Sequence, residues 1–99
     1  METGGSVYIM TNKTNNVLYV GVTSELWGRI YQHKNKCYPN SFSARYNTVK
    51  LVYYNHFPSI VEAIHEEKRI KGGSRAAKIK LINEMNPEWR DLEQDVLNE

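Results

Sequence analysis

The sequence of 99 residues is 40% hydrophobic and 24% charged, with a formal net charge of +2, which is an ordinary balance for a globular protein. This length and composition exclude a disordered or collagen-like chain, and they predict one domain, residues 1–99, with one core. The single cysteine, Cys37, excludes an internal disulfide, and there is neither a secretion signal nor an apolar run long enough to cross a membrane, so we expect a cytoplasmic protein without a membrane partner.

Two short β-prone runs come first in the chain. Residues 7–10 and 17–21 are rich in β-branched and aromatic side chains, and residues 11–16 between them form a polar stretch with three asparagines. This pattern predicts a β-hairpin. Its two strands would place Tyr8 and Tyr19 next to each other.

A helix, a loop and a third strand are predicted next. Thr23 or Ser24 can cap a helix that runs to about Lys34. Residues 36–47 have no clear periodicity, so we expect a loop there. Residues 48–57 have the composition of a strand.

The rest of the chain is predicted to be helical. Ser59 and Glu62 form a capping-box pattern at the start of a helix that ends at the glycine pair, residues 72–73. A further helix is expected over residues 74–85. The Asn-Pro pair at residues 86–87 would stop it.

The same Asn-Pro pair predicts the beginning of a short last helix. In this helix Trp89, Leu92 and Val96 would share one face. The element order is then ββαβααα, in which helices follow a small sheet instead of alternating with every strand. We therefore expect an α+β fold with a small, mostly antiparallel three-stranded sheet flanked by helices.

Charged side chains stand at helix positions that should face a core. The i, i+3, i+4, i+7 spacing gives the inward stripes as Leu26, Arg29, Ile30 and His33 in the first helix and Ile60, Ala63, Ile64 and Glu67 in the second. A lone buried charge is costly, so Arg29 and Glu67 are expected either to open onto a shared cleft or to pair with each other. The helix pattern alone favours an ordinary ion pair. On residue type alone, structural roles are likewise favoured for His33, Tyr8 and Tyr19.

Taken together, these residues resemble the GIY-YIG nuclease superfamily, whose pattern is a tyrosine in each of two hairpin strands, an arginine on the following helix and a glutamate on the next. The first motif corresponds to residues 6–8 (Ser-Val-Tyr), the second to residues 19–21 (Tyr-Val-Gly), and the arginine and glutamate to Arg29 and Glu67. Ser6 takes the place of the leading glycine of the first motif. This departure is expected to matter little, since the tyrosine carries the chemistry.

Within this superfamily the sequence is similar to small stand-alone bacterial proteins. Their characteristic segments are echoed at residues 29–34, at residues 68–72 and in the Asn-Pro-x-Trp of residues 86–89. The resemblance covers nearly the whole chain. It implies a metal-dependent endonuclease that hydrolyses DNA phosphodiester bonds, with DNA repair or recombination as the expected setting and with no organic cofactor.

The resemblance also implies a role for each site residue. Glu67 would anchor Mg²⁺ or Mn²⁺, since Mg²⁺ keeps several waters and takes further ligands from the substrate phosphate. Arg29 would hold the scissile phosphate. Tyr19 would be the general base, although a phenol is mostly protonated at neutral pH and needs nearby cations for this role. Tyr8 and His33 would orient the water or Tyr19.

Further basic residues are candidates for contacts with flanking phosphates. Lys34, Lys71 and Arg75 join Arg29 as predicted nucleic-acid-binding residues. Residues 1–80 carry 12 lysines and arginines against 5 carboxylates, whereas residues 81–99 carry 1 against 6. A basic body with an acidic tail suits a polyanionic partner such as DNA.

Two alternatives stay open at this point. One is a nucleic-acid-binding module that has the same fold and does not cleave. The other is a purely structural domain in which Arg29 and Glu67 form a buried salt bridge. Other enzyme classes lack support, because the sequence contains no phosphate-binding Gly-rich loop, no paired Cys-x-x-Cys and no His-Glu-x-x-His.

Overall fold

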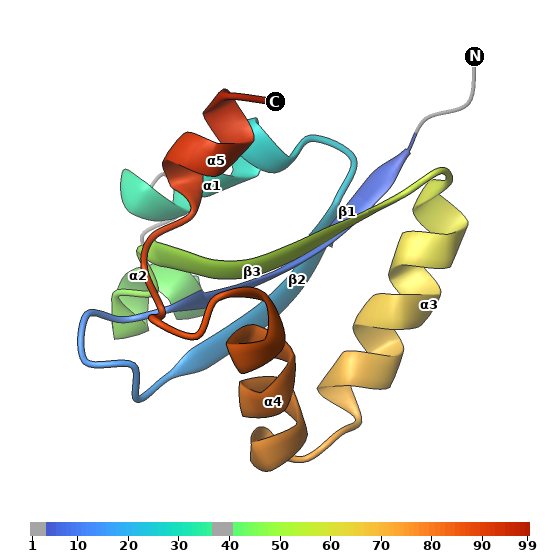
Figure 1. Ribbon diagram of the computed structural model, residues 1–99. Helices are drawn as coiled ribbons and strands as arrows, with labels where there is room; N and C mark the ends of the chain where they lie inside the picture. Colours follow the sequence, from blue (N-terminus) through green and yellow to red (C-terminus); the bar gives the residue numbers. More distant parts are fainter. Residues whose placement is uncertain (1–3, 37–40) are drawn as a thin grey trace.

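The chain folds into a three-stranded antiparallel sheet with helices packed on both of its faces (Figure 1). The computed structural model describes residues 4–36 and 41–99, with the backbone alone for Phe42 and Ser43; residues 37–40 of the predicted loop, which include Cys37, lie outside the described residues. The elements are β1 (Gly5–Thr11), β2 (Leu18–Thr23), α1 (Leu26–Lys34), α2 (Phe42–Tyr46), β3 (Lys50–Phe57), α3 (Ile60–Lys71), α4 (Arg75–Met85) and α5 (Glu93–Leu97). The α+β fold with a small antiparallel sheet is therefore confirmed.

The central strand of the sheet is β1, which pairs with β2 on one side and with β3 on the other. Its side chains alternate, so Val7 and Ile9 pack on one face while Tyr8 and Met10 pack on the other. Every residue of β1 is buried because both faces are covered. We expected one core, but the sheet divides the buried side chains into two clusters.

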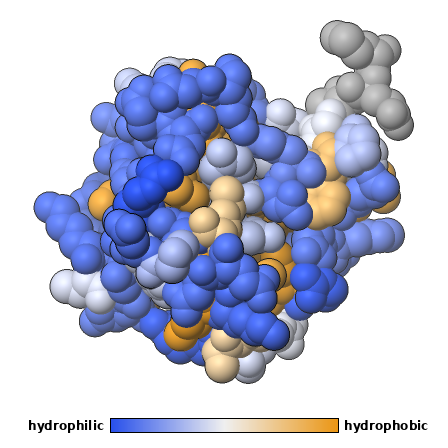
Figure 2. All heavy atoms as spheres, viewed as in Figure 1, coloured by the Kyte–Doolittle hydropathy of each residue, from blue (hydrophilic) through white to orange (hydrophobic). Residues whose placement is uncertain are grey.

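Each cluster is closed by its own pair of helices. α3 and α4 cover one face of the sheet, and α1 and α5 cover the other (Figure 1). Hydrophilic residues make up most of the surface in the same view, and hydrophobic residues are visible as smaller patches among them (Figure 2). Among the described residues, none of the helices combines the length and the apolar character needed to cross a membrane.

The helix cap predicted at Ser59 is confirmed, and Ser74 caps the following helix. The Ser59 hydroxyl accepts a hydrogen bond from the Glu62 N–H at the start of α3, at 3.2 Å. The Ser74 hydroxyl accepts one from the Ala77 N–H at the start of α4, at 3.0 Å. These side chains satisfy N–H groups that have no partner inside the first turn.

Two features before the third strand differ from the prediction. α1 is capped by Glu25 and not by Thr23 or Ser24, because Thr23 still belongs to β2 and its hydroxyl accepts the Glu25 N–H. A short helix, α2, lies inside the predicted loop, where the Ser41 hydroxyl accepts the Ala44 N–H and caps the turn. The element order is therefore ββααβααα.

The last helix begins later than predicted. Trp89 has a φ of 55°, in the left-handed region, so the chain cannot continue as a helix from Pro87, and α5 starts at Glu93. Trp89 packs against the cluster under α3 and α4, whereas Leu92 and Val96 pack against the cluster under α1 and α5. The predicted common face of these three residues is therefore wrong.

Candidate active site

Tyr8 and Tyr19 lie side by side on the α1 face of the sheet, with ring centroids 6.2 Å apart. The ring of His33, from the last turn of α1, lies 5.6 Å from the Tyr8 ring and 5.1 Å from the Tyr19 ring, and meets both edge-on. The Tyr8 hydroxyl and His33 Nε2 are at a hydrogen-bond distance of 3.0 Å. Tyr8, Tyr19 and His33 therefore form one group, which we call the ring cluster.

Gly21 provides the space for the Tyr8 side chain. Tyr8 and Gly21 are direct partners in the antiparallel pairing of β1 and β2. A Cβ atom on Gly21 would lie 2.4 Å from both Cζ and the hydroxyl oxygen of Tyr8, far inside contact distance. The second motif thus needs a glycine at this position because the Tyr8 ring lies where a side chain would be. The sequence analysis did not assign this role.

Arg29 reaches the ring cluster from α1 without being buried, contrary to the predicted stripe. Leu26, Ile30 and His33 are the buried residues of this helix, while Arg29 is exposed. The Arg29 guanidinium is close enough to the Tyr8 hydroxyl and to the His33 ring for its charge to act on the pKa of both. A long side chain allows this, because its backbone stays at the surface while its cationic end extends to the polar groups.

The surroundings set the protonation of two members of the ring cluster. Tyr8 is fully buried, and burial together with the neighbouring Tyr19 raises the pKa of Tyr8 above its ordinary value, against the opposing effect of Arg29. Tyr8 therefore keeps its proton at neutral pH. Burial and the charge of Arg29 lower the pKa of His33 to about 4, so its imidazole is neutral and one ring nitrogen can accept a hydrogen bond.

Glu67 comes from α3, which packs on β1 and β2 from the other face of the sheet. Its side chain is 14% exposed, and its carboxylate pairs with Lys71 Nζ at 3.4 Å, one helical turn further along. An ion pair between Glu67 and Arg29 is not found in the described part of the chain. A domain built around a buried Arg29–Glu67 bridge therefore has no structural basis.

The described residues contain no clustered set of protein ligands for a metal ion. No group of three or more His, Cys, Asp or Glu side chains that could hold a metal ion is present in this part of the chain. Glu67, nominated by the sequence, therefore has no second protein ligand in such a group. A metal held there would draw its other ligands from water and from a bound substrate.

The other predicted phosphate contacts have partners within the protein. Lys71 pairs with Glu67, as described above. Arg75 donates hydrogen bonds to the backbone carbonyls of Asn15 and Asn16, at 3.4 Å and 2.6 Å, and so joins the start of α4 to the turn between β1 and β2. Roles of these two cations in binding nucleic acid stay predictions.

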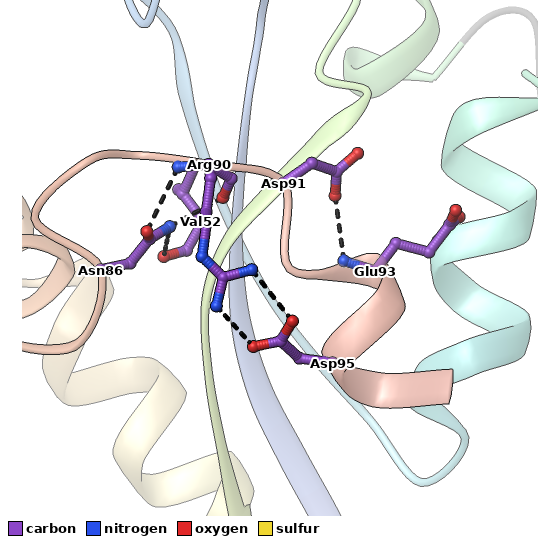
Figure 3. Close-up of polar contacts among 6 residues, drawn as sticks. All are labelled: Val52, Asn86, Arg90, Asp91, Glu93 and Asp95. Carbon is purple, nitrogen blue, oxygen red and sulfur yellow. Dashed lines mark hydrogen bonds and ion pairs between the residues drawn. The ribbon is translucent and has the colours of Figure 1, made fainter. Parts of the chain in front are cut away.

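Lys34 is held by the C-terminal segment. Its ammonium pairs with Asp91 and lies 3.4 Å from a carboxylate oxygen of Glu93. The second Asp91 oxygen accepts the N–H of Glu93 at 3.1 Å, drawn in Figure 3, and the N–H of Leu51 at 3.3 Å. Asp91 thus links α1, β3 and the start of α5. Nothing in the sequence pattern pointed to Asp91, because its partners are far away along the chain.

Comparison with known proteins identifies one family and several relatives. The sequence model described as the GIY-YIG catalytic domain matches residues 4–81. A UPF0213 protein of Clostridium perfringens is 34% identical over 90 residues, which covers 91% of this chain and 95% of that protein. A UPF0213 protein of Staphylococcus haemolyticus is 38% identical over 78 residues, covering 79% and 93%. The solution NMR structure of a UPF0213 protein of Bacillus halodurans superposes with a TM-score of 0.57 at 26% identity, covering 89% of this chain and 92% of that one.

Proposed function

Because the chain belongs to the GIY-YIG catalytic domain family, which is a nuclease superfamily, we propose that it is a divalent-metal-dependent endonuclease that hydrolyses DNA phosphodiester bonds. The observation that carries the proposal is the ring cluster with the Arg29 guanidinium beside it. A permanent cation next to phenol and imidazole groups supplies what phosphodiester hydrolysis requires, namely charge stabilisation and proton handling at one place.

Exposure separates the roles within this group. Arg29 is exposed and Tyr19 is partly exposed, so both can meet a substrate, whereas Tyr8 has no exposed surface. Arg29 would hold the scissile phosphate through its planar pair of donors. Tyr19, in its phenolate form, would accept the proton of the attacking water. Tyr8 and His33 would be positioning residues that hold the Tyr19 ring by packing and hydrogen bonding.

Glu67 is the residue that would hold the metal ion, Mg²⁺ or Mn²⁺. One carboxylate with no cluster of further ligands suits Mg²⁺, which keeps much of its water shell and completes it with substrate phosphate oxygens. When bound, the ion would supply Lewis-acid stabilisation of charge on the phosphate. The Glu67 side chain is largely shielded from solvent, and its carboxylate forms an ion pair with Lys71. A metal ion would therefore compete with the Lys71 ammonium for this carboxylate.

The substitution Glu67→Gln tests the proposal. It keeps the size of the side chain and removes the charge, so cleavage that depends on Mg²⁺ or Mn²⁺ should be lost while the fold is kept. We would incubate linear and branched DNAs with wild-type and variant protein, with and without metal or chelator, and separate the products by electrophoresis. Branched substrates also test the expected setting in repair or recombination.

Glu66→Gln is the matched control. Glu66 is the neighbouring carboxylate on α3, and it is paired with Arg69 on the outer surface of the helix. This variant should cleave like the wild type. Wild-type cleavage by Glu67→Gln would remove Glu67 from the site.

The Glu67–Lys71 ion pair is the observation that favours the alternative, a nucleic-acid-binding module that does not cleave. In that case Lys71 would neutralise the carboxylate permanently. The wild-type protein would then bind DNA and leave it intact at every metal concentration in the same assay.

A further inference from the structure

A cavity lies among the β1–β2 turn, the end of α1, the end of α2 and the start of β3, elements whose places Figure 1 shows. Its volume is about 880 Å³. Its walls include four lysines, one tyrosine and two asparagines, namely Asn12, Lys13, Lys34, Lys36, Tyr46, Asn47 and Lys50. We call it the lysine cavity. Of these seven residues, Lys34 alone is among the predicted site residues.

The charge of the lysine cavity is positive. Lys13, Lys36 and Lys50 line it, and Asp91, the acidic residue among its lining residues, is already paired with Lys34. The Lys36 ammonium donates a hydrogen bond to the Asn47 side-chain oxygen at 2.5 Å. Because the Asn47 amide is neutral, this contact does not compensate the charge of Lys36. Ammonium groups converging on one cavity attract a ligand that carries more than one negative charge.

Tyr46 adds an aromatic wall. It lies at the end of α2 and is 44% exposed, although tyrosine rings are usually covered on at least one face. The guanidinium of Arg45 stands 5.9 Å from its ring centroid. An exposed aromatic ring among cations is the arrangement that binds single-stranded nucleic acid, in which bases stack on the ring and phosphates contact the basic groups.

The lysine cavity and the ring cluster each include a residue from the last turn of α1. Lys34, which lines the cavity, follows His33 directly in α1, and the His33 ring contacts both Tyr8 and Tyr19. One strand could therefore extend from the phosphate held by Arg29 across the last turn of α1 into the cavity. The cavity has the size of a small-ligand pocket, which suits a nucleotide. Paired bases inside a duplex would have to leave the stack before they could enter.

We propose that the lysine cavity receives an unpaired nucleotide next to the scissile phosphate, with its base on Tyr46 and its phosphates on Lys13, Lys36 and Lys50. This inference rests on the proposed function and specifies its substrate class: nucleic acid with a single-stranded segment beside the cleavage point. A fully paired duplex lacks the nucleotide that fills the cavity.

Binding measurements without cleavage test this inference. The full-length Glu67→Gln protein, in chelator, would be titrated into fluorescein-labelled oligothymidylate of about 12 nucleotides, its oligouridylate equivalent and a blunt DNA duplex of the same length. Tyr46→Ala should weaken binding of the single strands about 5- to 150-fold, the range for loss of one stacked base. Duplex binding should change less than about twofold. Tyr46→Phe keeps the ring and should restore single-strand binding, which separates stacking from misfolding.

The lysines are tested by salt dependence. Replacing Lys13 and Lys50 together by glutamine should reduce the slope of log affinity against log salt for the single strand by about 1.4, the loss of two phosphate contacts. Matched controls are Lys80→Gln, an exposed lysine on α4, and Tyr31→Ala, an exposed tyrosine on α1. Both should bind like the parent protein.

Two results would overturn the inference: unchanged single-strand affinity in the Tyr46 and lysine variants, or an equal loss for duplex and single strand, which would indicate general electrostatic attraction. Because catalysis is switched off throughout, these outcomes do not depend on cleavage. A protein that binds single strands through the lysine cavity but never cleaves them would contradict the proposed endonuclease and leave the cavity assignment standing.

Discussion

Tyr8 and Tyr19 are neighbours with the same chemistry, yet their surroundings differ. Tyr8 is fully buried and its raised pKa keeps it protonated, so it is suited to donate a hydrogen bond and to hold its neighbours in place. Tyr19 is partly exposed at the same cluster, where a substrate phosphate could reach it. The difference arises because Tyr8 is on the central strand and Tyr19 on an edge strand.

The variant Tyr19→Phe tests the assignment of the general base. It removes only the phenolic oxygen, so the ring packing should survive while single-turnover cleavage of bound DNA slows by about 10²- to 10⁴-fold. The rate would be measured across pH for both proteins. A variant with an unchanged rate and pH profile would exclude Tyr19 as the base.

Gly21→Ala should disturb the site through Tyr8. The new Cβ would lie 2.4 Å from the Tyr8 hydroxyl oxygen, so the ring must move, and we expect a loss of about 1–3 kcal/mol in the free energy of unfolding together with slower cleavage. Denaturant titration and cleavage assays would measure both. Gly28→Ala is the control, because the nearest atoms to its Cβ, in the Glu25 side chain, are 3.6 Å away. Alanine there should be neutral or stabilising, as it is within a helix.

At the scale of elements, the segment between α4 and α5, residues 86–92, binds the C-terminal part of the chain to the sheet through hydrogen bonds. The Asn86 amide donates to the carbonyls of Val52 and Arg90, at 3.2 Å and 2.8 Å, and its oxygen accepts the Arg90 N–H (Figure 3). The Arg90 guanidinium binds both carboxylate oxygens of Asp95, at 3.0 Å and 2.8 Å. These contacts hold the chain through its left-handed turn and set the position of Asp91, which pairs with Lys34.

Asn86→Ala should therefore be more damaging than a typical surface change. It leaves buried carbonyls without donors, and we expect the free energy of unfolding to fall by on the order of 2 kcal/mol in a urea titration. Asn83→Ala is the comparison, because the Asn83 side-chain oxygen accepts an exposed hydrogen bond from the Trp89 indole N–H. Its cost should stay below about 1 kcal/mol. Equal costs for the two variants would show that Asn86 does not organise this segment.

At the scale of the whole molecule, the acidic tail predicted from the sequence folds back onto the basic body. Asp91 and Glu93 lie on Lys34, and the carboxylate of Glu99 contacts the His56 ring at 3.0 Å. Several carboxylates of the tail thus have positively charged or polar partners within the protein. Within the described part of the chain, Lys13, Lys36 and Lys50 form no ion pair, and all three line the lysine cavity at one end of the sheet.

The stability of the folded protein should fall between about pH 6.5 and pH 5 because of His33. Its pKa is about 4 in the folded state, below the ordinary value, so in this window the unfolded chain takes up a proton that the folded chain does not. The free energy of unfolding should therefore decrease with falling pH, by up to about 1.4 kcal/mol per unit. Glu66 and Asp95, whose pKa values are lowered by their arginine partners, respond at lower pH.

Urea titrations at several pH values would measure this slope. His33→Gln removes the titrating group and keeps a hydrogen-bonding side chain, so the slope over this window should decrease in the variant. The same slope in both proteins would assign the pH dependence to other groups.

The sequence by itself determined the features that depend on a few neighbouring residues. Alternating β-prone runs around an asparagine-rich turn predicted the hairpin, and therefore the closeness of Tyr8 and Tyr19. The capping pattern at Ser59 marked the start of α3, because a cap binds an N–H only two or three residues away. Helical spacing also placed His33 on the buried side of α1.

Only the tertiary structure decided how these elements meet. Helix periodicity treated Arg29 and Glu67 as inward-facing partners, but it carries no information about which face of the sheet a helix covers, and α1 and α3 cover opposite faces. Trp89 was separated from Leu92 by a left-handed turn that the Asn-Pro pattern did not reveal. The need for Gly21 and the link between Asp91 and Lys34 likewise depend on contacts across strands and between distant segments, which are set by packing and not by local propensity.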